Sequence, residues 1–215
     1  VKKVIALSTD KAVNPINLYG ATKLAAEKLF INSNIISAGA NTVFSVVRYG
    51  NVLSSRGSVI PFFKDMIKQK KNFLPITNLK MTRFFISLED SANFVAECIN
   101  KMYGGEIFIP KMPSIKMVDI AKALNPNIKF KIIGLRPGEK LHEALCAAES
   151  SHLTYQFKKS FLIIPSIGLP PRCNFKKIIK KYNGQIVKKG FEYVSNKNNF
   201  VKTNELKKIL NKPSY

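Results

Sequence analysis

Long hydrophobic runs and paired cysteines are both missing from this 215-residue sequence. No apolar stretch reaches the roughly 18 residues that a membrane-spanning helix requires, so we expect no membrane span and no membrane partner. The three cysteines, Cys98, Cys146 and Cys173, are odd in number and widely spaced, with no Cys-x-x-Cys pair. This usage disfavours a disulfide framework and a zinc site, and it indicates reduced thiols. We therefore expect a cytoplasmic protein with no bound metal.

Arginine is scarce although the sequence is strongly basic. Lysine and arginine together number 35 against 13 acidic residues, a formal net charge of +22, yet only five of them are arginine. Base-reading proteins favour arginine because its planar fork pairs with guanine at two points. The excess, 21 basic against 6 acidic residues in 111–215 and 14 against 7 before it, is mostly lysine. This pattern is typical of a compositional bias, so we expect no nucleic-acid partner.

The sequence also lacks the glycine pattern of a dinucleotide-binding loop. In Rossmann folds a Gly-x-Gly-x-x-Gly segment between the first strand and the first helix holds the cofactor pyrophosphate. No two of the eleven glycines stand two positions apart. The sequence begins at Val1, inside a strand pattern, rather than at a methionine. We therefore expect a piece of a longer protein, or a gene that has lost its front.

An alternation of strand and helix patterns is present. Hydrophobic residues make up 46% of the sequence and charged residues 22%, which is typical of a globular protein. Short β-branched runs and helical faces alternate up to Pro110, and this predicts an α/β fold with a doubly wound parallel sheet. The elements predicted in this part are strands at 3–8, 42–47, 84–86 and 106–109, a loop at 50–57, and helices at 17–36, after Ser58 and at 88–102.

The alternation is looser beyond Pro110. We predict that residues 1–110 are the C-terminal part of a Rossmann-like domain and carry the catalytic residues. Residues 111–215 are predicted to form a smaller α+β substrate lobe with a basic tail, and elements of the two parts interleave. The elements predicted in the second part are a helix at 117–124, a strand at 129–133, a turn at 136–139 and a last helix at 204–210, with 155–215 otherwise irregular.

Tyr19 and Lys23 stand four residues apart on the first predicted helix. Residues at this spacing lie on one helix face, so the ammonium of Lys23 can sit beside the phenol of Tyr19. A positive neighbour favours the phenolate, which makes a tyrosine usable as a base in hydride chemistry. Two further Tyr-x-x-x-Lys matches, at 155–159 and 193–197, are expected by chance in so lysine-rich a sequence. Tyr19 differs in context, because the spacing is filled by Gly20-Ala21-Thr22 and a strand ends upstream in Ser8-Thr9-Asp10-Lys11.

Together with other motifs, these residues resemble one enzyme family. The sequence is similar to the extended short-chain dehydrogenase/reductases, and specifically to the inverting UDP-N-acetylglucosamine 4,6-dehydratases that open the pseudaminic-acid pathway of flagellated bacteria. The resemblance covers residues 1–150, and the tail at 195–199 only approximates the asparagine-rich ending of the family. The motifs that carry it are Ser8–Ala12 with Asn14-Pro15, Tyr19–Lys23, Arg48–Val52, Ser55–Pro61, Met81–Phe84, Gly104–Phe108 and Arg136–Glu143.

The resemblance implies a lyase that uses NADP and UDP-N-acetylglucosamine. In this family hydride leaves sugar carbon 4 for NADP⁺, water is lost across carbons 5 and 6, and hydride returns to carbon 6 with inversion at carbon 5. The resemblance implies that Thr9 bonds the reacting 4-hydroxyl and that Tyr19 is the base of the hydride step. It also implies that Lys11 is the base at carbon 5, and that Asp10 is the acid that helps the 6-hydroxyl depart.

Binding residues are implied in the same way. Tyr19, Lys23 and Val52 are expected to bind the NADP. Arg136 matches the arginine that pairs with the substrate diphosphate, since a guanidinium fork suits two phosphate oxygens. The amides that open the helix after Ser58 are also well placed for a diphosphate. The expected substrate-binding set is Asn51, Arg56, Gly57, Ser58, Val59, Ile60, Thr77, Arg136 and Glu139.

Three hypotheses about function remain open. The first is an NADP-dependent sugar-nucleotide dehydratase that is a homo-oligomer when full length; a capsule-type dehydratase that also epimerises is its variant. The second is a binding-only remnant that holds a UDP-sugar weakly, and the third is a basic nucleic-acid module. Because the phosphate-binding loop is absent, we expect the 215-residue chain alone to bind NADP⁺ poorly and to turn over little substrate.

Overall fold

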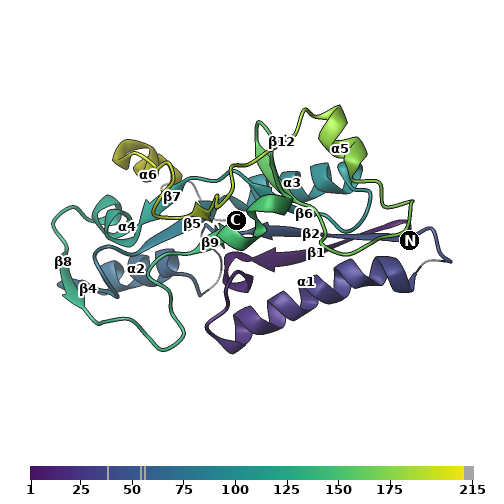
Figure 1. Cartoon of the computed structure of the whole chain (residues 1–215). Helices are drawn as coiled ribbons and strands as arrows, with labels where there is room; N and C mark the ends of the chain where they lie inside the picture. Colours follow the sequence, from purple (N-terminus) through teal and green to yellow (C-terminus); the bar gives the residue numbers. More distant parts are fainter. Residues whose placement is uncertain (38, 54, 56, 211–215) are drawn as a thin grey trace. The chain divides into compact units, whose positions relative to one another are not determined.

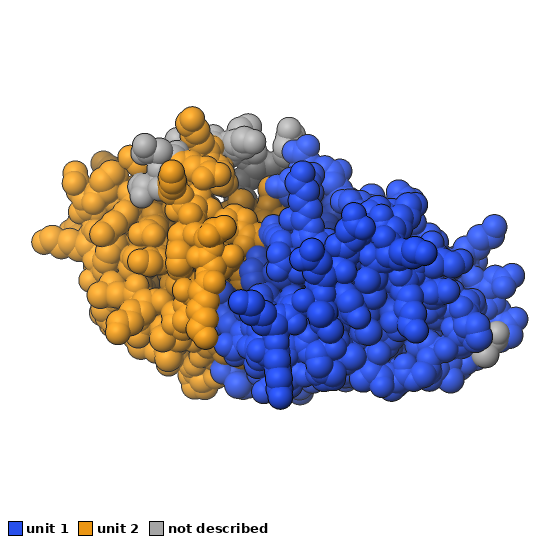
Figure 2. Space-filling model, turned by 45° about the horizontal axis from the view of Figure 1, so that its top comes forward, with its two compact units in different colours: residues 1–50, 89–111, 144–194 blue, residues 51–88, 112–143, 195–215 orange. Residues whose placement is uncertain are grey.

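The computed structural model describes residues 1–37, 39–53, 55 and 57–210, and the chain divides into two compact units (Figures 1 and 2). Three segments form each unit, so the chain passes repeatedly from one to the other. The expected boundary after residue 110 lies beside one of these junctions, but 51–88 joins the second unit and 144–194 the first. Unit 1 is Val1–Gly50, Glu89–Lys111 and Ala144–Val194, and unit 2 is Asn51–Leu88, Met112–Glu143 and Ser195–Tyr215.

Unit 1 is built on a six-stranded sheet with the strand order β1-β2-β6-β11-β10-β12. The first three strands are parallel and the other three continue the sheet in antiparallel pairs. Strands β1 and β2 pair over their full length, from Lys3 opposite Val43 to Thr9 opposite Tyr49. The α/β fold with parallel strands is therefore confirmed. The strands are β1 (Lys3–Thr9), β2 (Val43–Tyr49), β6 (Ile107–Pro110), β10 (Thr154–Gln156), β11 (Ser160–Ile163) and β12 (Gln185–Ile186).

Helices cover both faces of this sheet, because side chains alternate between the faces along each strand. Val47 of β2 packs in a core cluster with Cys98 of α3 and Ile178 of α5, whereas its neighbour Arg48 bonds Glu27 of α1. Figure 1 shows α1 running along β1 and β2. The helices of unit 1 are α1 (Leu18–Ile36), α3 (Leu88–Lys101) and α5 (Lys176–Lys181), and its short elements are η1 (Asp10–Ala12), β9 (Ala144–Cys146), η2 (Ala148–Leu153) and β13 (Tyr193–Val194).

The prediction that residues 155–215 are irregular up to the last helix is wrong. This part supplies β11, which pairs with β6 and places Phe161 opposite Ile109 and Leu162 opposite Phe108. Leu162 is almost wholly buried. A four-residue strand that follows two lysines carries little local signal, and its stability comes from pairing with a strand about fifty residues upstream.

Unit 2 holds two small sheets and three helices around its own core. The sheets have the orders β3-β5-β7 and β4-β8, and the core gathers side chains such as Phe63, Leu74, Ile120 and Leu206. The helices predicted after Ser58 and at 117–124 and 204–210 are confirmed, as is the strand near 129–133. The elements are β3 (Asn51–Val52), α2 (Val59–Lys68), β4 (Phe73–Ile76), β5 (Thr82–Ile86), β7 (Ser114–Lys116), α4 (Met117–Leu124), β8 (Lys129–Ile132) and α6 (Thr203–Leu210).

The described ranges contain neither a candidate membrane span nor a candidate metal-binding cluster. None of the helices there combines the length and the apolar character needed to cross a bilayer. In the same ranges, no three His, Cys, Asp or Glu side chains gather closely enough to hold a metal ion.

Candidate active site

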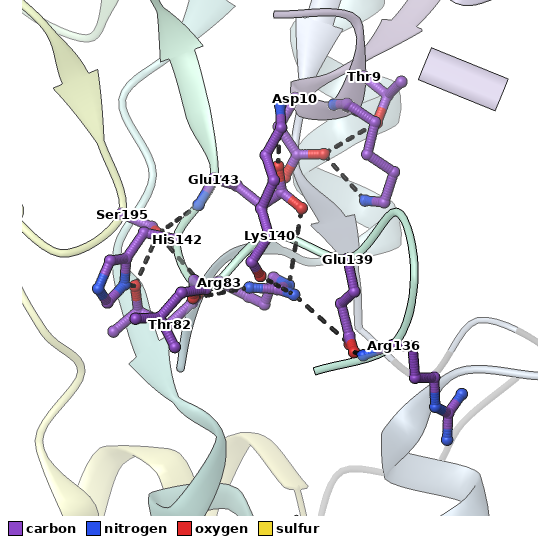
Figure 3. Close-up of polar contacts among 12 residues, drawn as sticks. Thr9, Asp10, Thr82, Arg83, Arg136, Glu139, Lys140, His142, Glu143 and Ser195 are labelled. Carbon is purple, nitrogen blue, oxygen red and sulfur yellow. Dashed lines mark hydrogen bonds and ion pairs between the residues drawn. The ribbon is translucent and has the colours of Figure 1, made fainter. Parts of the chain in front are cut away.

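The carboxyl end of β1 turns sharply into a single 3₁₀ turn that carries three of the predicted catalytic residues. Thr9 is the N-cap of this turn, and its hydroxyl oxygen accepts from the backbone N–H of Lys11 at 3.4 Å. The Thr9 hydroxyl donates to Asp10 Oδ1 at 3.0 Å, and Lys11 Nζ lies 3.0 Å from the same oxygen (Figure 3). Thr9, Asp10 and Lys11 therefore form one hydrogen-bonded group at the end of a parallel strand, where α/β proteins place their ligands.

Asp10 is wholly buried, and its two carboxylate oxygens differ sharply. Oδ1 accepts from Thr9 and forms the ion pair with Lys11, while Oδ2 has no hydrogen-bond partner among the described residues. Leaving a buried acceptor unpaired costs about 1–3 kcal/mol, so such atoms are rare and are found at functional sites. The Lys11 side chain is about one-third exposed. The pair thus has one buried oxygen and one accessible ammonium to offer to a ligand.

Helix α1 packs against this turn at Gly20, a position where only a residue without a Cβ fits. A Cβ on Gly20 would lie 2.3 Å from the carbonyl oxygen of Lys11 and 3.0 Å from Pro15 Cβ. The side chain of Asn17, the N-cap of α1, accepts from the Gly20 N–H at 2.7 Å. Gly20 therefore lets the first turn of α1 touch the backbone of the Asp10–Lys11 turn.

Tyr19 and Lys23 lie on this same first part of α1. Lys23 Nζ donates to the carbonyl oxygen of Leu7 in β1 at 2.6 Å, which anchors the ammonium near the strand end. The Tyr19 side chain is 55% exposed. Burial, and after it the neighbouring phenol of Tyr19, raises the pKa of Tyr49 at the end of β2. Tyr19 is the more exposed phenol of the two.

A buried charged network fixes α1 to the sheet behind the turn. Arg48 Nε and Nη2 donate to the two oxygens of Glu27 at 2.9 and 2.5 Å, and Ser8 donates to Glu27 Oε1 at 2.5 Å. Arg48 Nη1 also donates to the carbonyl oxygen of Leu145 at 2.8 Å. All the charges in this network are paired and bonded, as burial requires. The network ties β1, α1, β2 and β9 together next to the Thr9–Lys11 turn.

In unit 2 the start of α2 presents unpaired polar atoms. Ser58 is the N-cap of α2, but its side chain makes no cap hydrogen bond, and Ser58 Oγ has no partner among the described residues. Asn51 Oδ1 in β3 is a second buried oxygen without a partner in that part of the chain. Helix N-termini with free amides attract anions. This end of α2 therefore has the groups that a phosphate would use.

The other residues expected near α2 differ in what they can offer. Gly57 has a φ of 73°, a conformation that favours glycine. The Ile60 side chain is only 1% exposed and belongs to the core of unit 2, and Val59 packs against that core. The Ile60 side chain is therefore unavailable to a ligand, and the Val59 side chain is only partly exposed. Arg56 lies outside the described residues.

Two parallel strands of unit 2, β4 and β8, end at the same edge of their sheet. The expected binding residues that follow them are Thr77, Arg136 and Glu139. β4 and β8 are parallel, with Ile76 opposite Ile132, and the Ile133 N–H donates to the Ile76 carbonyl at 3.0 Å. Thr77 comes directly after β4, and the exposed Arg136 follows β8 in a tight turn. Glu139 closes this turn, since its N–H donates to the Arg136 carbonyl at 3.0 Å and its Oε2 accepts from the Arg136 N–H at 3.3 Å.

Sequence reasoning missed one residue that organises this turn, Arg83 of β5. Its guanidinium contacts the backbone of Lys140 and Leu141 and the carboxylates of Glu139 and Glu143 (Figure 3). A usable signal was present in the sequence, because Arg83 is one of only five arginines and stands in a strand whose other residues are mostly apolar.

His142 lies in the same region of unit 2. Its Nδ1 is 2.7 Å from the hydroxyl of Thr82, which also contacts the Ser195 hydroxyl at 2.7 Å. Burial, and then the charge of Arg83, lowers the pKa of His142. The histidine is thus kept neutral in a hydrogen-bonded chain of side chains.

The donor set at the end of β1 fits a nicotinamide ribose. The Lys23 ammonium has three donors, and one is bound to Leu7, so two remain for hydroxyl groups of a ligand. The exposed Tyr19 hydroxyl is four residues away on the same helix face. Val52, the third residue expected to bind the cofactor, lies in β3 of unit 2.

Known proteins with similar sequences include a dehydratase and an epimerase. The chain is 54% identical over 213 residues to the inverting UDP-N-acetylglucosamine 4,6-dehydratase of Campylobacter jejuni, an alignment that covers 98% of this chain and 64% of the relative. It is 48% identical over 153 residues to the UDP-glucose 4-epimerase of Rickettsia bellii, covering 69% of this chain and 45% of that protein. The chain thus spans less than two thirds of the length of these relatives.

A solved structure and a family model extend the comparison. The X-ray structure of Pen from Bacillus thuringiensis superposes with a TM-score of 0.84 at 34% identity, covering 98% of this chain and 62% of that one. The model of the family described as "polysaccharide biosynthesis protein" matches residues 1–165, which include the turn at the end of β1, α1 and the start of α2. The chain therefore belongs to the polysaccharide biosynthesis protein family.

Proposed function

We propose that this chain is the catalytic and substrate-binding part of an inverting UDP-N-acetylglucosamine 4,6-dehydratase. The observation that carries the proposal is the buried Asp10–Lys11 pair with its unpartnered Oδ2. Loss of water across two carbons needs one group that takes a proton from carbon and one that gives a proton to the departing hydroxyl. A carboxyl and an amine in contact meet both needs.

Proton transfer inside the pair prepares both groups at once. The Lys11 ammonium lies 3.0 Å from Asp10 Oδ1, so a proton that passes between them leaves a neutral amine and a carboxylic acid. The amine then takes the proton from carbon 5, and the acid gives its proton to the hydroxyl that leaves carbon 6 as water. Both groups finish as they began, an ammonium and a carboxylate. The proton that Tyr19 takes from the 4-hydroxyl balances the proton that carbon 5 gains when hydride returns to carbon 6, so no external acid or base is consumed.

Tyr19 and Thr9 act at the 4-hydroxyl of the sugar in this proposal. Thr9 bonds the hydroxyl, and Tyr19 takes its proton so that carbon 4 becomes a ketone, which acidifies the hydrogen on carbon 5. The exposure of Tyr19 supports this assignment, because its hydroxyl is open to a ligand. NADP is the cofactor we propose, held by Tyr19, Lys23 and Val52; when bound, it accepts hydride from the sugar and returns it.

The nucleotide part of the substrate is assigned to unit 2. We propose that the diphosphate is bound by the amides and Ser58 hydroxyl at the start of α2 and by Arg136, with Arg56 as a further contact. Thr77 and Glu139 face the uridine side, and Asn51 contacts the sugar nucleotide. The unpartnered oxygens of Ser58 and Asn51 support this assignment, because a ligand would supply the missing hydrogen bonds.

The place of the protein in the cell is proposed on the same basis. Cys98, Cys146 and Cys173 are all free and buried, and burial raises the pKa of each thiol. Free thiols suit the reducing cytoplasm. The product, a UDP-linked 4-keto-6-deoxy sugar, would enter pseudaminic-acid-type glycan synthesis such as flagellin glycosylation, and the full-length enzyme would be a homo-oligomer.

A second candidate is an epimerase, which the similarity to the Rickettsia bellii protein favours. The two activities differ at carbon 6, since only a dehydratase releases the 6-hydroxyl. Nuclear magnetic resonance of the product separates them directly: a dehydratase gives a 6-methyl signal and a 4-ketone, whereas a 4-epimerase keeps the 6-hydroxymethyl group.

The binding experiment uses this chain as it stands. Calorimetric titration with UDP-N-acetylglucosamine, NADP⁺ and a DNA duplex compares the three hypotheses in one buffer. We expect saturable binding of the UDP-sugar that Arg136→Met weakens, and little binding of NADP⁺. Tighter binding of the duplex than of the UDP-sugar at physiological salt would contradict the proposal.

A further inference from the structure

Arg83 is a charged residue in the middle of an apolar strand. Every residue of β5 is buried, and Arg83 itself is only 7% exposed. A guanidinium cannot lose its proton in a protein, so its burial requires bonded partners. The position of those partners shows what the residue does.

The guanidinium of Arg83 donates hydrogen bonds to backbone carbonyls of the chain that follows β8. Nη2 donates to the Lys140 carbonyl at 2.8 Å, and Nη1 donates to the Leu141 carbonyl at 3.1 Å and to its own neighbour Thr82 at 2.8 Å. The Thr82 N–H adds a bond to the Leu141 carbonyl at 3.2 Å. This chain segment therefore lies along β5 because Arg83 binds its carbonyls.

Two carboxylates complete the surroundings of Arg83. Nη2 is 3.7 Å from Glu139 Oε1, and Nε is 3.9 Å from Glu143 Oε1. The second oxygen of Glu139 accepts from the backbone N–H of Arg136. A continuous path thus runs from the buried guanidinium of Arg83 through Glu139 to the backbone of Arg136. Figure 3 shows the Arg136 side chain extending away from this cluster.

We propose that Arg83 is a positioning residue for the substrate diphosphate. It holds the segment 136–143, which includes the Arg136–Glu139 turn, so that Arg136 projects toward that diphosphate. This inference rests on the proposed function, because the diphosphate is the ligand assigned there to Arg136. Arg83 also helps to balance the charges of Glu139 and Glu143, and Lys140 Nζ lies 3.8 Å from the second oxygen of Glu143. Two unbalanced carboxylates beside the turn would repel a diphosphate.

Lysine cannot replace arginine in this role. The planar fork of Arg83 reaches three carbonyls and two carboxylates in fixed directions, whereas an ammonium is a single point with three rotatable donors. Arg83→Lys keeps the charge and loses the geometry. It is therefore the variant that separates positioning from simple charge balance.

The first experiment measures how much the diphosphate adds to binding. Affinities of this chain for UDP and for uridine are measured by titration, and their ratio gives the contribution of the diphosphate. We expect Arg83→Lys to reduce this ratio about tenfold while uridine affinity stays constant, the loss of one well-placed charged contact. We expect Arg136→Met to abolish the preference for UDP over uridine. Adding Arg83→Lys to Arg136→Met should then cause no further loss of UDP affinity. Arg172→Lys, which alters a partly buried arginine of unit 1, is the matched control.

Two results would overturn the proposal. One is an equal loss of uridine and UDP affinity in Arg83→Lys, which would indicate general damage to the fold. The other is a loss that adds in full to that of Arg136→Met, which would show independent action. If Arg83→Lys does not fold by circular dichroism, Arg83→Gln, which keeps a planar donor group but fewer donors, replaces it and is held to the same two criteria.

Hydrogen exchange of the ligand-free protein distinguishes this inference from the proposed function. We expect Arg83→Lys to speed exchange of the Arg136 and Glu139 amides while β8 stays protected. Unchanged exchange at these amides would overturn the inference even if UDP binds well. A wild-type chain that binds UDP no better than uridine would instead refute the diphosphate assignment, and the role of Arg83 toward the diphosphate with it.

Discussion

The carbonyl oxygen of Lys11 occupies the place where any side chain at position 20 would begin. A Cβ on Gly20 would lie 2.3 Å from this oxygen, closer than any real contact of that kind. The glycine between Tyr19 and Lys23 therefore lets the helix that carries them touch the turn that carries Asp10 and Lys11. The two groups of predicted catalytic residues are brought together by this backbone contact.

Gly20→Ala should consequently force α1 away from the turn. We expect the free energy of unfolding to fall by about 1–3 kcal/mol, the usual cost of overpacking. Gly168→Ala is the control, because a Cβ there meets no atom within 4 Å. Urea unfolding of the two variants measures the difference, and equal stabilities would show that the contact is not restrictive.

The buried Glu27–Arg48 pair should matter far more for stability than an exposed pair in the same unit. Glu27→Gln leaves Arg48 buried with an uncompensated charge, so we expect a loss of about 3–5 kcal/mol in the free energy of unfolding. Glu97→Gln breaks the half-exposed pair with Lys101 and should cost less than about 1 kcal/mol. A loss in Glu27→Gln as small as in Glu97→Gln would contradict this ranking.

The low pKa of His142 predicts how stability changes in acid. Its folded-state pKa lies below the ordinary value of 6.5, because burial and the nearby Arg83 disfavour the charged ring. The stabilisation is fully present above pH 6.5 and is lost as the pH falls below it, since the unfolded chain takes up the proton first. Unfolding free energies measured across this range should show that slope, and His142→Gln should flatten it. A slope unchanged in His142→Gln would assign it to other groups.

Tyr19→Phe should distinguish the tyrosine proposed for catalysis from those of the two chance Tyr-x-x-x-Lys matches. The assay uses a chimera that joins this chain to the part of the Campylobacter jejuni relative that it does not match. We expect turnover to fall by about 10²–10⁴-fold, the usual share of one acid–base group. Tyr155→Phe and Tyr193→Phe should be near neutral. Tyr193 is nearly buried and packs on Phe161 through its ring, which phenylalanine preserves. Similar losses in all three variants would refute the assignment.

Lys11→Met and Asp10→Asn should stop the reaction at different points. In the same chimera, Lys11→Met should abolish exchange of the carbon-5 hydrogen with deuterated water, while a 4-keto sugar still forms. Asp10→Asn should retain this exchange but slow the loss of water by about 10²–10⁴-fold. Mass spectrometry of the recovered sugar nucleotide measures both. Exchange at the wild-type rate in Lys11→Met would mean that Lys11 is not the base.

What the sequence determined by itself is local. The long helix from Asn17, the helix that begins after Ser58 and the Thr9-Asp10-Lys11 turn are governed by neighbours a few residues away, through caps, periodicity and short hydrogen bonds. The two helices could therefore be predicted from the sequence pattern, whereas the residues proposed for catalysis were named by the resemblance to a known family.

Only the tertiary structure decided which distant residues support that site. Arg83 is bonded to carbonyls 57 and 58 residues away, Arg48 to a carbonyl 97 residues away, and β11 to β6 across the intervening helix-containing segments. Contacts at such separations leave no periodic trace in the sequence, because each depends on the whole path of the chain between its partners. The sequence names Asp10 and Lys11 as candidates, and the fold supplies Gly20, Arg48 and Arg83 to hold the turns in place.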